Sequence, residues 1–250
     1  IPPPVGCYLG NWGAAKSPIS AGVHRPLKLT CITSQSSPRQ KPLVLIAADL
    51  GWWKNKDDER FVRDGILKEY TLEPSQLMFC LSHTHSGPGL CRNDSSKAGG
   101  EHIEPYLLTL QQAGIKAVAD SLSNTIAATL EWHYGKCTLA TNRDLETMDQ
   151  IAYAVGFNPA NKADDLLLVG RIIDKEEKVM ATIVNYACPP TTLGWDNLLI
   201  SPDYVGAMRE IVQLKTGAPC LFLQGASGEL APAEQYVVDV TNADKHGRQP

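Results

Sequence analysis

Residues 76–89 read Gln76-Leu77-Met78-Phe79-Cys80-Leu81-Ser82-His83-Thr84-His85-Ser86-Gly87-Pro88-Gly89. The first part is an apolar run of strand length, and the last part is a turn rich in glycine and proline. Because alternate residues of a strand point to the same face, His83 and His85 are expected to project together from a strand end. Two neighbouring imidazoles are a common first half of a zinc site, although a pair of surface histidines has the same spacing.

The overall composition is that of an ordinary globular protein. The chain has 250 residues, of which 43% are hydrophobic and 20% are charged, which is enough for one large domain or two small ones. The formal net charge is −4 and no basic run occurs, which argues against a nucleic-acid partner. No apolar stretch reaches the ~18 residues of a membrane span, so a soluble protein without a transmembrane segment is predicted.

The ends and the cysteines bear on the compartment. The chain starts at Ile1 rather than at a methionine, so we interpret it as a processed or excerpted piece. If a signal segment has been removed, the protein is secreted or periplasmic; the sequence itself leaves the compartment and the oligomeric state open. The seven cysteines are scattered without a C-x-x-C pair, which argues against a disulfide scaffold.

Apolar patterning predicts strands that alternate with helices. Strands are expected at residues 27–32, 42–49, 76–82, 129–141, 166–173, 178–187 and 220–223. Helices are expected from a cap at Asp57 to about residue 70, from a first turn at Pro105 to about residue 123, and from a cap at Ser201 to Gly217. Since residues 166–187 indicate a hairpin, we predict one α/β domain, residues 1–250, with a mixed β-sheet flanked by helices in a layered, hydrolase-like arrangement.

Other polar residues follow the predicted strands and are expected to meet the histidine pair in a crevice at the strand ends. Asp49 either orients a metal-bound histidine from behind or caps a turn. Arg143 either holds a substrate oxygen with its planar guanidinium group or forms a surface ion pair with Asp144. Cys188 is either a soft metal ligand or a buried structural thiol.

Residues 224–229 form a glycine-rich turn after the strand at 220–223. Gly225, Ser227 and Gly228 either direct backbone amide groups at a ligand in the cleft or make a simple tight turn. The G-x-S-x-G nucleophile elbow does not match, because Glu229 stands in place of its last glycine. A serine hydrolase that uses Ser227 is therefore a weak alternative.

Together these segments resemble the N-terminal part of the catalytic domain of the neutral, non-lysosomal ceramidase family. The most specific of them is the block Ser82 to Gly89. The supporting pieces, in chain order, are Gly22-Val23-His24-Arg25-Pro26-Leu27, the strand ending in Asp49, Asn142-Arg143, Asn185-Tyr186-Ala187 and the run from Gln224 to Pro232.

The resemblance implies a zinc-dependent amidohydrolase that cleaves the N-acyl bond of a small or lipid-like, sphingolipid-type acyl amide. It implies that His83 binds zinc, that His85 acts on the substrate or the reacting oxygen, and that Arg143 faces the substrate or its oxyanion. In such an enzyme the zinc ion polarises the amide carbonyl and lowers the pKa of a bound water to about 7.

The sequence departs from the family pattern in three respects. Pro189 stands where the family has a zinc-binding histidine, and Ala231 stands where ceramidases have a serine proposed to take part in catalysis. The remaining zinc ligands of the family come from a C-terminal half that this sequence does not contain. With His83 as the one ligand assigned, the chain alone is expected to bind zinc weakly or not at all, because a catalytic zinc uses three protein ligands. The alternative is a non-catalytic family member that keeps the fold and a ligand-binding pocket.

Overall fold

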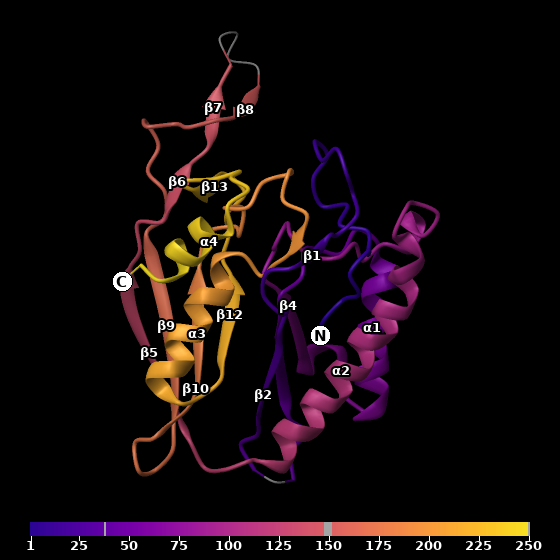
Figure 1. Ribbon diagram of the computed structural model, residues 1–250. Helices are drawn as coiled ribbons and strands as arrows, with labels where there is room; N and C mark the ends of the chain where they lie inside the picture. Colours follow the sequence, from indigo (N-terminus) through magenta and orange to yellow (C-terminus); the bar gives the residue numbers. More distant parts are fainter. Residues whose placement is uncertain (38, 148–151, 250) are drawn as a thin grey trace.

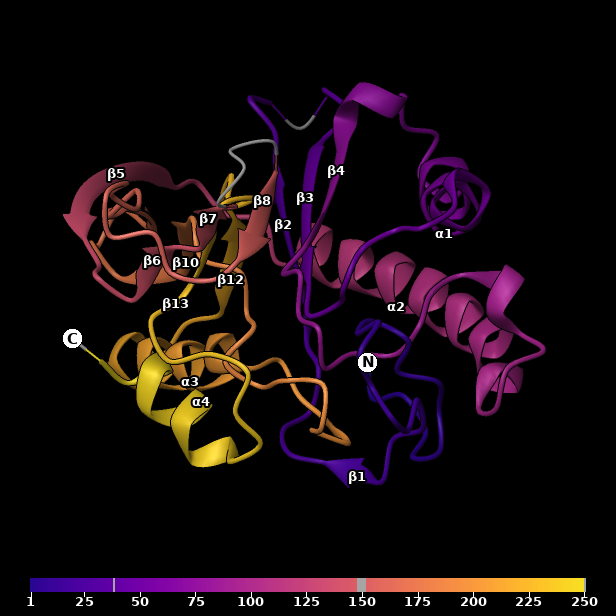
Figure 2. The same cartoon turned by 90° about the horizontal axis from the view of Figure 1, so that it is seen from above.

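The structure is a computed structural model and describes residues 1–37, 39–147 and 152–249. Two mixed β-sheets lie side by side, with α1 and α2 over one and α3 and α4 over the other (Figure 1). Seen from above, α1 and α2 lie on the side of their sheet that faces away from the other sheet (Figure 2). The predicted mixed α/β architecture is confirmed, with two such sheets in place of the single one expected.

The first sheet has the order β2-β3-β4. Its strands are β2 (Leu29–Ser34), β3 (Leu43–Ala48) and β4 (Leu77–Leu81). β3 runs parallel to β4 and antiparallel to β2. The helices α1 (Lys56–Glu69) and α2 (Ile103–Ser123) cover it, and the interface buries apolar side chains including Ile46, Val62, Ile66, Leu107 and Val118.

The second sheet has the order β12-β10-β9-β5. Its strands are β5 (Thr129–Lys136), β9 (Leu166–Ile173), β10 (Val179–Tyr186) and β12 (Cys220–Gln224). β9 and β10 form the predicted antiparallel pair, while β10 and β12 run parallel. The helix α3 (Tyr204–Thr216) packs on it through Tyr204 and Val205, and α4 (Val240–Gly247) lies against α3.

Short strand pairs lie outside these two sheets. β1 (Gly22–Val23) pairs with β11 (Leu199–Ile200), and β6 (Ala140–Asn142) pairs with β13 (Leu230–Pro232). β7 (Asp144–Glu146) and β8 (Tyr153–Val155) form an antiparallel pair that projects beyond the sheets in Figure 1. Single 3-10 turns occur at η1 (Pro74–Gln76), η2 (Arg92–Asp94) and η3 (Gly100–His102).

The N-termini of two helices differ from the prediction, because the side chain of a neighbouring residue caps each helix. α1 is capped by Asn55, not Asp57, because the Asn55 side chain accepts a hydrogen bond from the Asp57 amide. α3 begins after Asp203 rather than after Ser201, whose hydroxyl accepts from the Asp203 amide. Gly217 ends α3 in the left-handed conformation, as predicted.

The strand predicted at residues 129–141 is divided into β5 and β6, because the chain leaves β9 and turns to pair with β13. Because of this division, the residues after β6 lie near the ends of β10 and β12, and Arg143 is one of them. No helix in the described part of the chain combines the length and the apolar character needed to cross a membrane.

Candidate functional site

The histidine pair lies at the edge of the first sheet where the parallel strands β3 and β4 end. The amide of Ser82 donates to the carbonyl of Ala48, and the amide of His83 donates to the carbonyl of Leu50, both at 2.9 Å. His83 then adopts a left-handed backbone conformation with φ of 69°, which is strained for a residue other than glycine. The imidazoles of His83 and His85 lie side by side, with ring centroids 5.2 Å apart.

The spacing therefore brings the two histidines together, but not by strand alternation alone. Both residues lie beyond the last residue of β4, and the turn at His83 sets their directions. Thr84 between them is buried, and its hydroxyl donates to the carbonyl of Ser201 at 2.8 Å. The turn is thus anchored to the segment that leads into α3. The chemical roles of both imidazoles stay predictions.

Tryptophan rings cover the pair. The Trp52 ring centroid lies 4.9 Å from that of His83 and 4.8 Å from that of His85. Trp12, from the N-terminal segment, lies 4.3 Å from His85. Burial among these rings removes water from both imidazoles, which disfavours their charged forms.

The pKa values of both histidines are lowered as a result. For His83 the main cause is burial, followed by the nearby charge of Arg143. Burial, then His83, then Arg143 lower the pKa of His85 to about 3. Both imidazoles are therefore neutral near pH 7. The Nδ1 atom of His85 is buried and has no hydrogen-bond partner in the described part of the chain, so it can accept a proton, a hydrogen bond or a metal.

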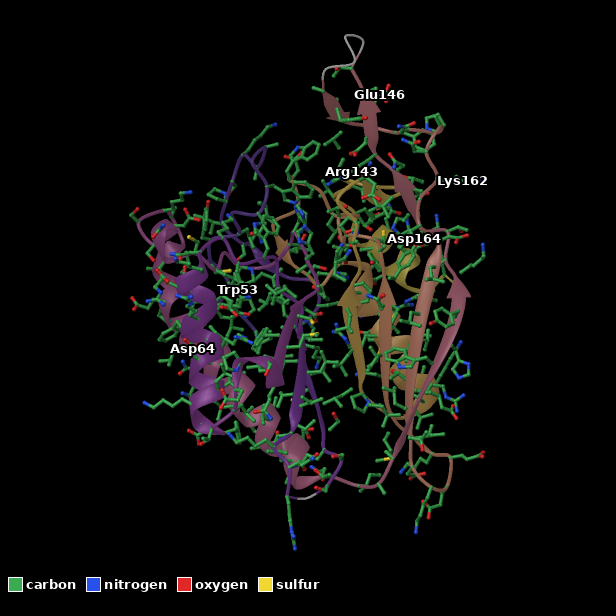
Figure 3. All side chains as sticks on the ribbon, turned by 180° about the vertical axis from the view of Figure 1, so that it is seen from behind. Trp53, Asp64, Arg143, Glu146, Lys162 and Asp164 are labelled. Atoms are coloured by element: carbon green, nitrogen blue, oxygen red, sulfur yellow. The ribbon has the colours of Figure 1, made fainter. Side chains whose placement is uncertain are left out.

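Arg143 follows β6 at the base of the projecting β7–β8 pair, where Figure 3 labels it. Its guanidinium group donates to the carbonyl of Gly228, at 2.8 Å from Nη2 and 3.3 Å from Nε. Its amide donates to the carbonyl of Glu229 at 2.8 Å. These hydrogen bonds run to the 224–229 turn rather than to Asp144, so the guanidinium group is positioned by the turn.

The glycine-rich turn is held by the strands it follows. The amide of Gly225 donates to the carbonyl of Tyr186 at 2.9 Å, and an added Cβ at Gly225 would lie 3.0 Å from backbone atoms of Ala187. The Ser227 hydroxyl accepts from the Gln224 side chain at 2.7 Å. Toward Arg143 the turn presents the carbonyl of Gly228. That amide groups of the turn face a ligand stays a prediction.

Asp49 is buried at the end of β3, where its carboxylate contacts α3 and the backbone just before β2. Its carboxylate accepts from the Lys28 amide at 2.7 Å, from Nη1 of Arg209 at 2.7 Å and from Nη2 of Arg209. No hydrogen bond in residues 1–37, 39–147 and 152–249 joins Asp49 to a histidine. These contacts assign Asp49 to the packing of α3 against the first sheet.

Three other residues considered from the sequence lie in the core. Cys188 is fully buried, and burial raises the pKa of its thiol well above the ordinary value, which favours a structural thiol. Pro189 is buried as well, and its carbonyl accepts from the Thr191 amide at 2.8 Å. Ala231 is buried on β13 opposite Thr141. Neither Pro189 nor Ala231 offers a side-chain ligand.

The described residues do not make a complete zinc site. In the described part of the chain, no group of three or more His, Cys, Asp or Glu side chains is placed to hold a metal ion. The pair of imidazoles has the right ligand type, and His85 has an unpartnered ring nitrogen. A catalytic zinc nevertheless uses three protein ligands, so the set is short by at least one.

Sequence patterns did not predict that Trp195 and Tyr236 lie near the pair. Trp195 and Tyr236 lie in loops far apart in the chain, and both rings contact Trp12. A cavity of about 560 Å³ lies elsewhere, against α1 and α2, and is lined by Phe61, Glu101, Glu104 and Leu108 among others. The histidine pair is not part of that cavity.

No protein-family model matches the chain, and no curated protein matches it either. Solved structures do match. The neutral ceramidase from Pseudomonas aeruginosa superposes with a TM-score of 0.76 at 18% identity, over 97% of this chain and 40% of that one. The chain has the fold of part of a neutral ceramidase. A ceramidase complexed with C2 gives a TM-score of 0.73 at 19% identity, over 98% of this chain and 40% of that one.

The ceramidase fold confirms the resemblance found in the sequence at the level of architecture. The chain spans 40% of the length of each ceramidase, consistent with an N-terminal part of that fold. Identities of 18% and 19% establish the fold and leave the chemistry to be argued from the residues themselves.

Proposed function

We propose that the chain forms part of a hydrolase that cleaves the amide bond of a lipid-like N-acyl substrate. The observation that supports this most is the contact between two neutral imidazoles, His83 and His85, at the ends of parallel strands in a ceramidase fold. Strand ends are where α/β proteins place their sites. The strained backbone of His83 is of the kind that accumulates at such sites.

The lowered pKa of His85 supports one of two roles for it. A general base works best when its pKa lies near the working pH, and about 3 is far below neutrality. We therefore assign His85 to hydrogen bonding with the substrate or the reacting oxygen through Nδ1, rather than to proton abstraction. Arg143 holds the substrate oxygen with the N–H groups that do not bond Gly228.

We propose zinc as the cofactor, with His83 as one ligand and the missing ligands supplied from outside the described residues. Purified full-length protein should contain zinc, and His83→Ala should lose most of it and at least tenfold in kcat/KM on an N-acyl sphingoid amide, equivalent to ~1.4 kcal/mol. His133→Ala, an exposed histidine on β5, is the matched control for both readouts. Equal zinc content in His83→Ala and wild type would show that His83 is not a ligand.

Arg143 provides a second test of the site. Arg143→Lys keeps the charge but cannot make the two-pronged contact with Gly228 or with a substrate oxygen. We expect both Arg143→Lys and Arg143→Ala to lower kcat/KM at least tenfold, or ~1.4 kcal/mol, while the melting temperature changes little. Steady-state kinetics of the three proteins decide this. Unchanged kinetics for both variants would place Arg143 outside the site.

A second candidate function is a non-catalytic protein that keeps the ceramidase fold and binds a ligand. Pro189 and Ala231 favour it, because both are buried and neither can coordinate a metal or act as a nucleophile. The two functions differ in one assay. Full-length protein that binds an N-acyl amide but releases no fatty acid, with zinc supplied, supports the non-catalytic function.

A further inference from the structure

Three aromatic side chains meet next to the histidine pair, from loops that are distant in the sequence. Trp12 lies with its ring centroid 6.0 Å from that of Trp195 and 5.4 Å from that of Tyr236, and Trp195 lies 5.4 Å from Tyr236. We call these three residues the aromatic corner. All three are partly exposed, so the corner borders solvent rather than the core.

The aromatic corner is continuous with the candidate catalytic residues. Trp12 contacts the other two rings of the corner and also the imidazole of His85, whose ring centroid lies 4.3 Å from that of Trp12. Trp52 then spans His85 and His83 on the other side. A ligand whose reacting group touches His85 can therefore extend directly over Trp12 toward Trp195 and Tyr236.

The backbone of the corner is fixed at a conformational cost. Tyr236 has a φ of 62°, in the left-handed region that non-glycine residues rarely occupy. Its amide donates to the carbonyl of Thr191 at 3.2 Å, and a Cβ at Gly194 would lie 2.7 Å from the Tyr236 carbonyl oxygen. On the other side, the Asn11 side chain donates to the carbonyl of Gly87 at 2.9 Å and ties the segment of Trp12 to the histidine turn. Strain of this kind persists only where the surrounding structure holds it.

The ring directions favour a flexible chain over a flat ring as the ligand. The plane of Trp12 stands at 76° to that of Trp195 and at 89° to that of Tyr236. The rings therefore do not form one flat surface on which a sugar or a base would stack. An alkyl chain can follow such a corner and transfer its methylene groups from water onto the rings.

Two polar atoms lie where the aromatic corner meets His85. The indole Nε1 of Trp12 is buried without a hydrogen-bond partner in the described part of the chain, as is Nδ1 of His85. Buried hydrogen-bond donors and acceptors normally find a partner. A hydrocarbon chain that carries an amide offers such a partner at the end that would lie beside Trp12 and His85.

We propose that Trp12, Trp195 and Tyr236 form the subsite that binds the hydrocarbon chain next to the scissile amide. The proposal rests on the proposed function for the position of the amide. It makes Tyr236 and Trp195 determinants of chain-length specificity. The chain can come from the acyl group or from the amine side of the substrate, and the kinetic test below separates the two.

Binding is measured first, because it needs no turnover. The tryptophans of the corner report ligand by their fluorescence, and hexanoate, laurate and palmitate serve as probes with full-length protein. Wild type should bind palmitate most tightly and hexanoate least. Tyr236→Ala, which keeps every tryptophan, should weaken palmitate at least tenfold, or ~1.4 kcal/mol, and hexanoate much less. Tyr236→Phe keeps the ring and should bind as wild type does.

Tyr134→Ala is the matched control, since Tyr134 is a 74% exposed tyrosine on β5 outside the site. It should leave palmitate binding unchanged. Equal palmitate affinity in wild type and Tyr236→Ala would overturn the proposal. So would a fluorescence response to methyl glucoside without one to palmitate, because the corner would then bind sugar rings.

Kinetics then identify the source of the chain. Two series of N-acyl amides are compared, one with a growing acyl chain and one with a growing amine-side chain. In wild type kcat/KM should rise with chain length in one series, and Trp195→Ala should flatten that series. Trp132→Ala on β5 is its control. If kcat/KM of Trp195→Ala rises with chain length as steeply as that of wild type in both series, the subsite proposal is overturned. If wild type binds palmitate but hydrolyses none of the substrates, that result contradicts only the proposed function.

Discussion

Replacing Arg209 by methionine is expected to lower the free energy of unfolding by about 3–5 kcal/mol. Both terminal nitrogens of Arg209 donate to the carboxylate of Asp49, and the two side chains are only 7% and 2% exposed. Methionine fills a similar volume but removes the charge. The Asp49 carboxylate would then stay buried with the Lys28 amide as its remaining partner, and a buried charge without compensation is costly.

Urea denaturation of a matched set of variants measures this effect. The double variant Asp49→Leu/Arg209→Met should recover most of the loss, because replacing a whole buried ion pair by apolar groups is often close to neutral. Lys116→Met is the surface control. It breaks an exposed pair with Asp120, and such pairs contribute at most about 1 kcal/mol. An Arg209→Met variant as stable as Lys116→Met would show that the buried pair does not hold α3 against the first sheet.

The ion pair matters for the candidate site because of where it lies. Asp49 directly follows β3 and precedes Leu50, whose carbonyl accepts a hydrogen bond from the amide of His83. α3 also follows Ser201, whose carbonyl receives the hydroxyl of Thr84. Loss of the Arg209 contact should therefore loosen the turn that places the two histidines as well as the global fold.

Local patterns were sufficient to predict the elements around the site. The apolar runs that became β3, β4, β9, β10 and β12 are strands because their side chains fill the interior, and burial depends on runs that are visible in the sequence. The contact between His83 and His85 was also predictable from a local pattern. The two residues are only two positions apart, which keeps both near the end of one strand.

Long-range partners were not predictable in this way. Asp49 was considered as a partner of a histidine, but it binds Arg209, which lies 160 residues away. Whether a carboxylate at a strand end faces a loop or a helix depends on how the second sheet packs, and no spacing in the sequence encodes that. The same holds for Trp12 and Tyr236, which meet only because the N-terminal segment and the loop after β13 fold over the same strand ends.

Acidification is expected to destabilise the metal-free protein through His85. The pKa of His85 is about 3 in the folded protein, against 6.5 for a free imidazole, mainly because of burial. Between these values the unfolded chain binds a proton at this residue and the folded chain does not, so stability falls as the pH falls from 6.5 toward 3. From about pH 7 to about pH 4 the loss amounts to about 3 kcal/mol for this one side chain. His83, whose pKa is also lowered, acts in the same direction.

The variant His85→Gln isolates this contribution, because glutamine is polar but does not titrate. Urea denaturation with a chelator present, at several pH values between 7 and 4, should show wild type losing about 3 kcal/mol more than the variant over that range. His133→Gln, which replaces a 58% exposed histidine on β5, should follow wild type at every pH. If His85→Gln and wild type lose stability in parallel, the His85 imidazole takes up its proton without unfolding. The pair would then be open to water, and the assignment of His85 as a neutral hydrogen-bonding partner of the substrate would be wrong.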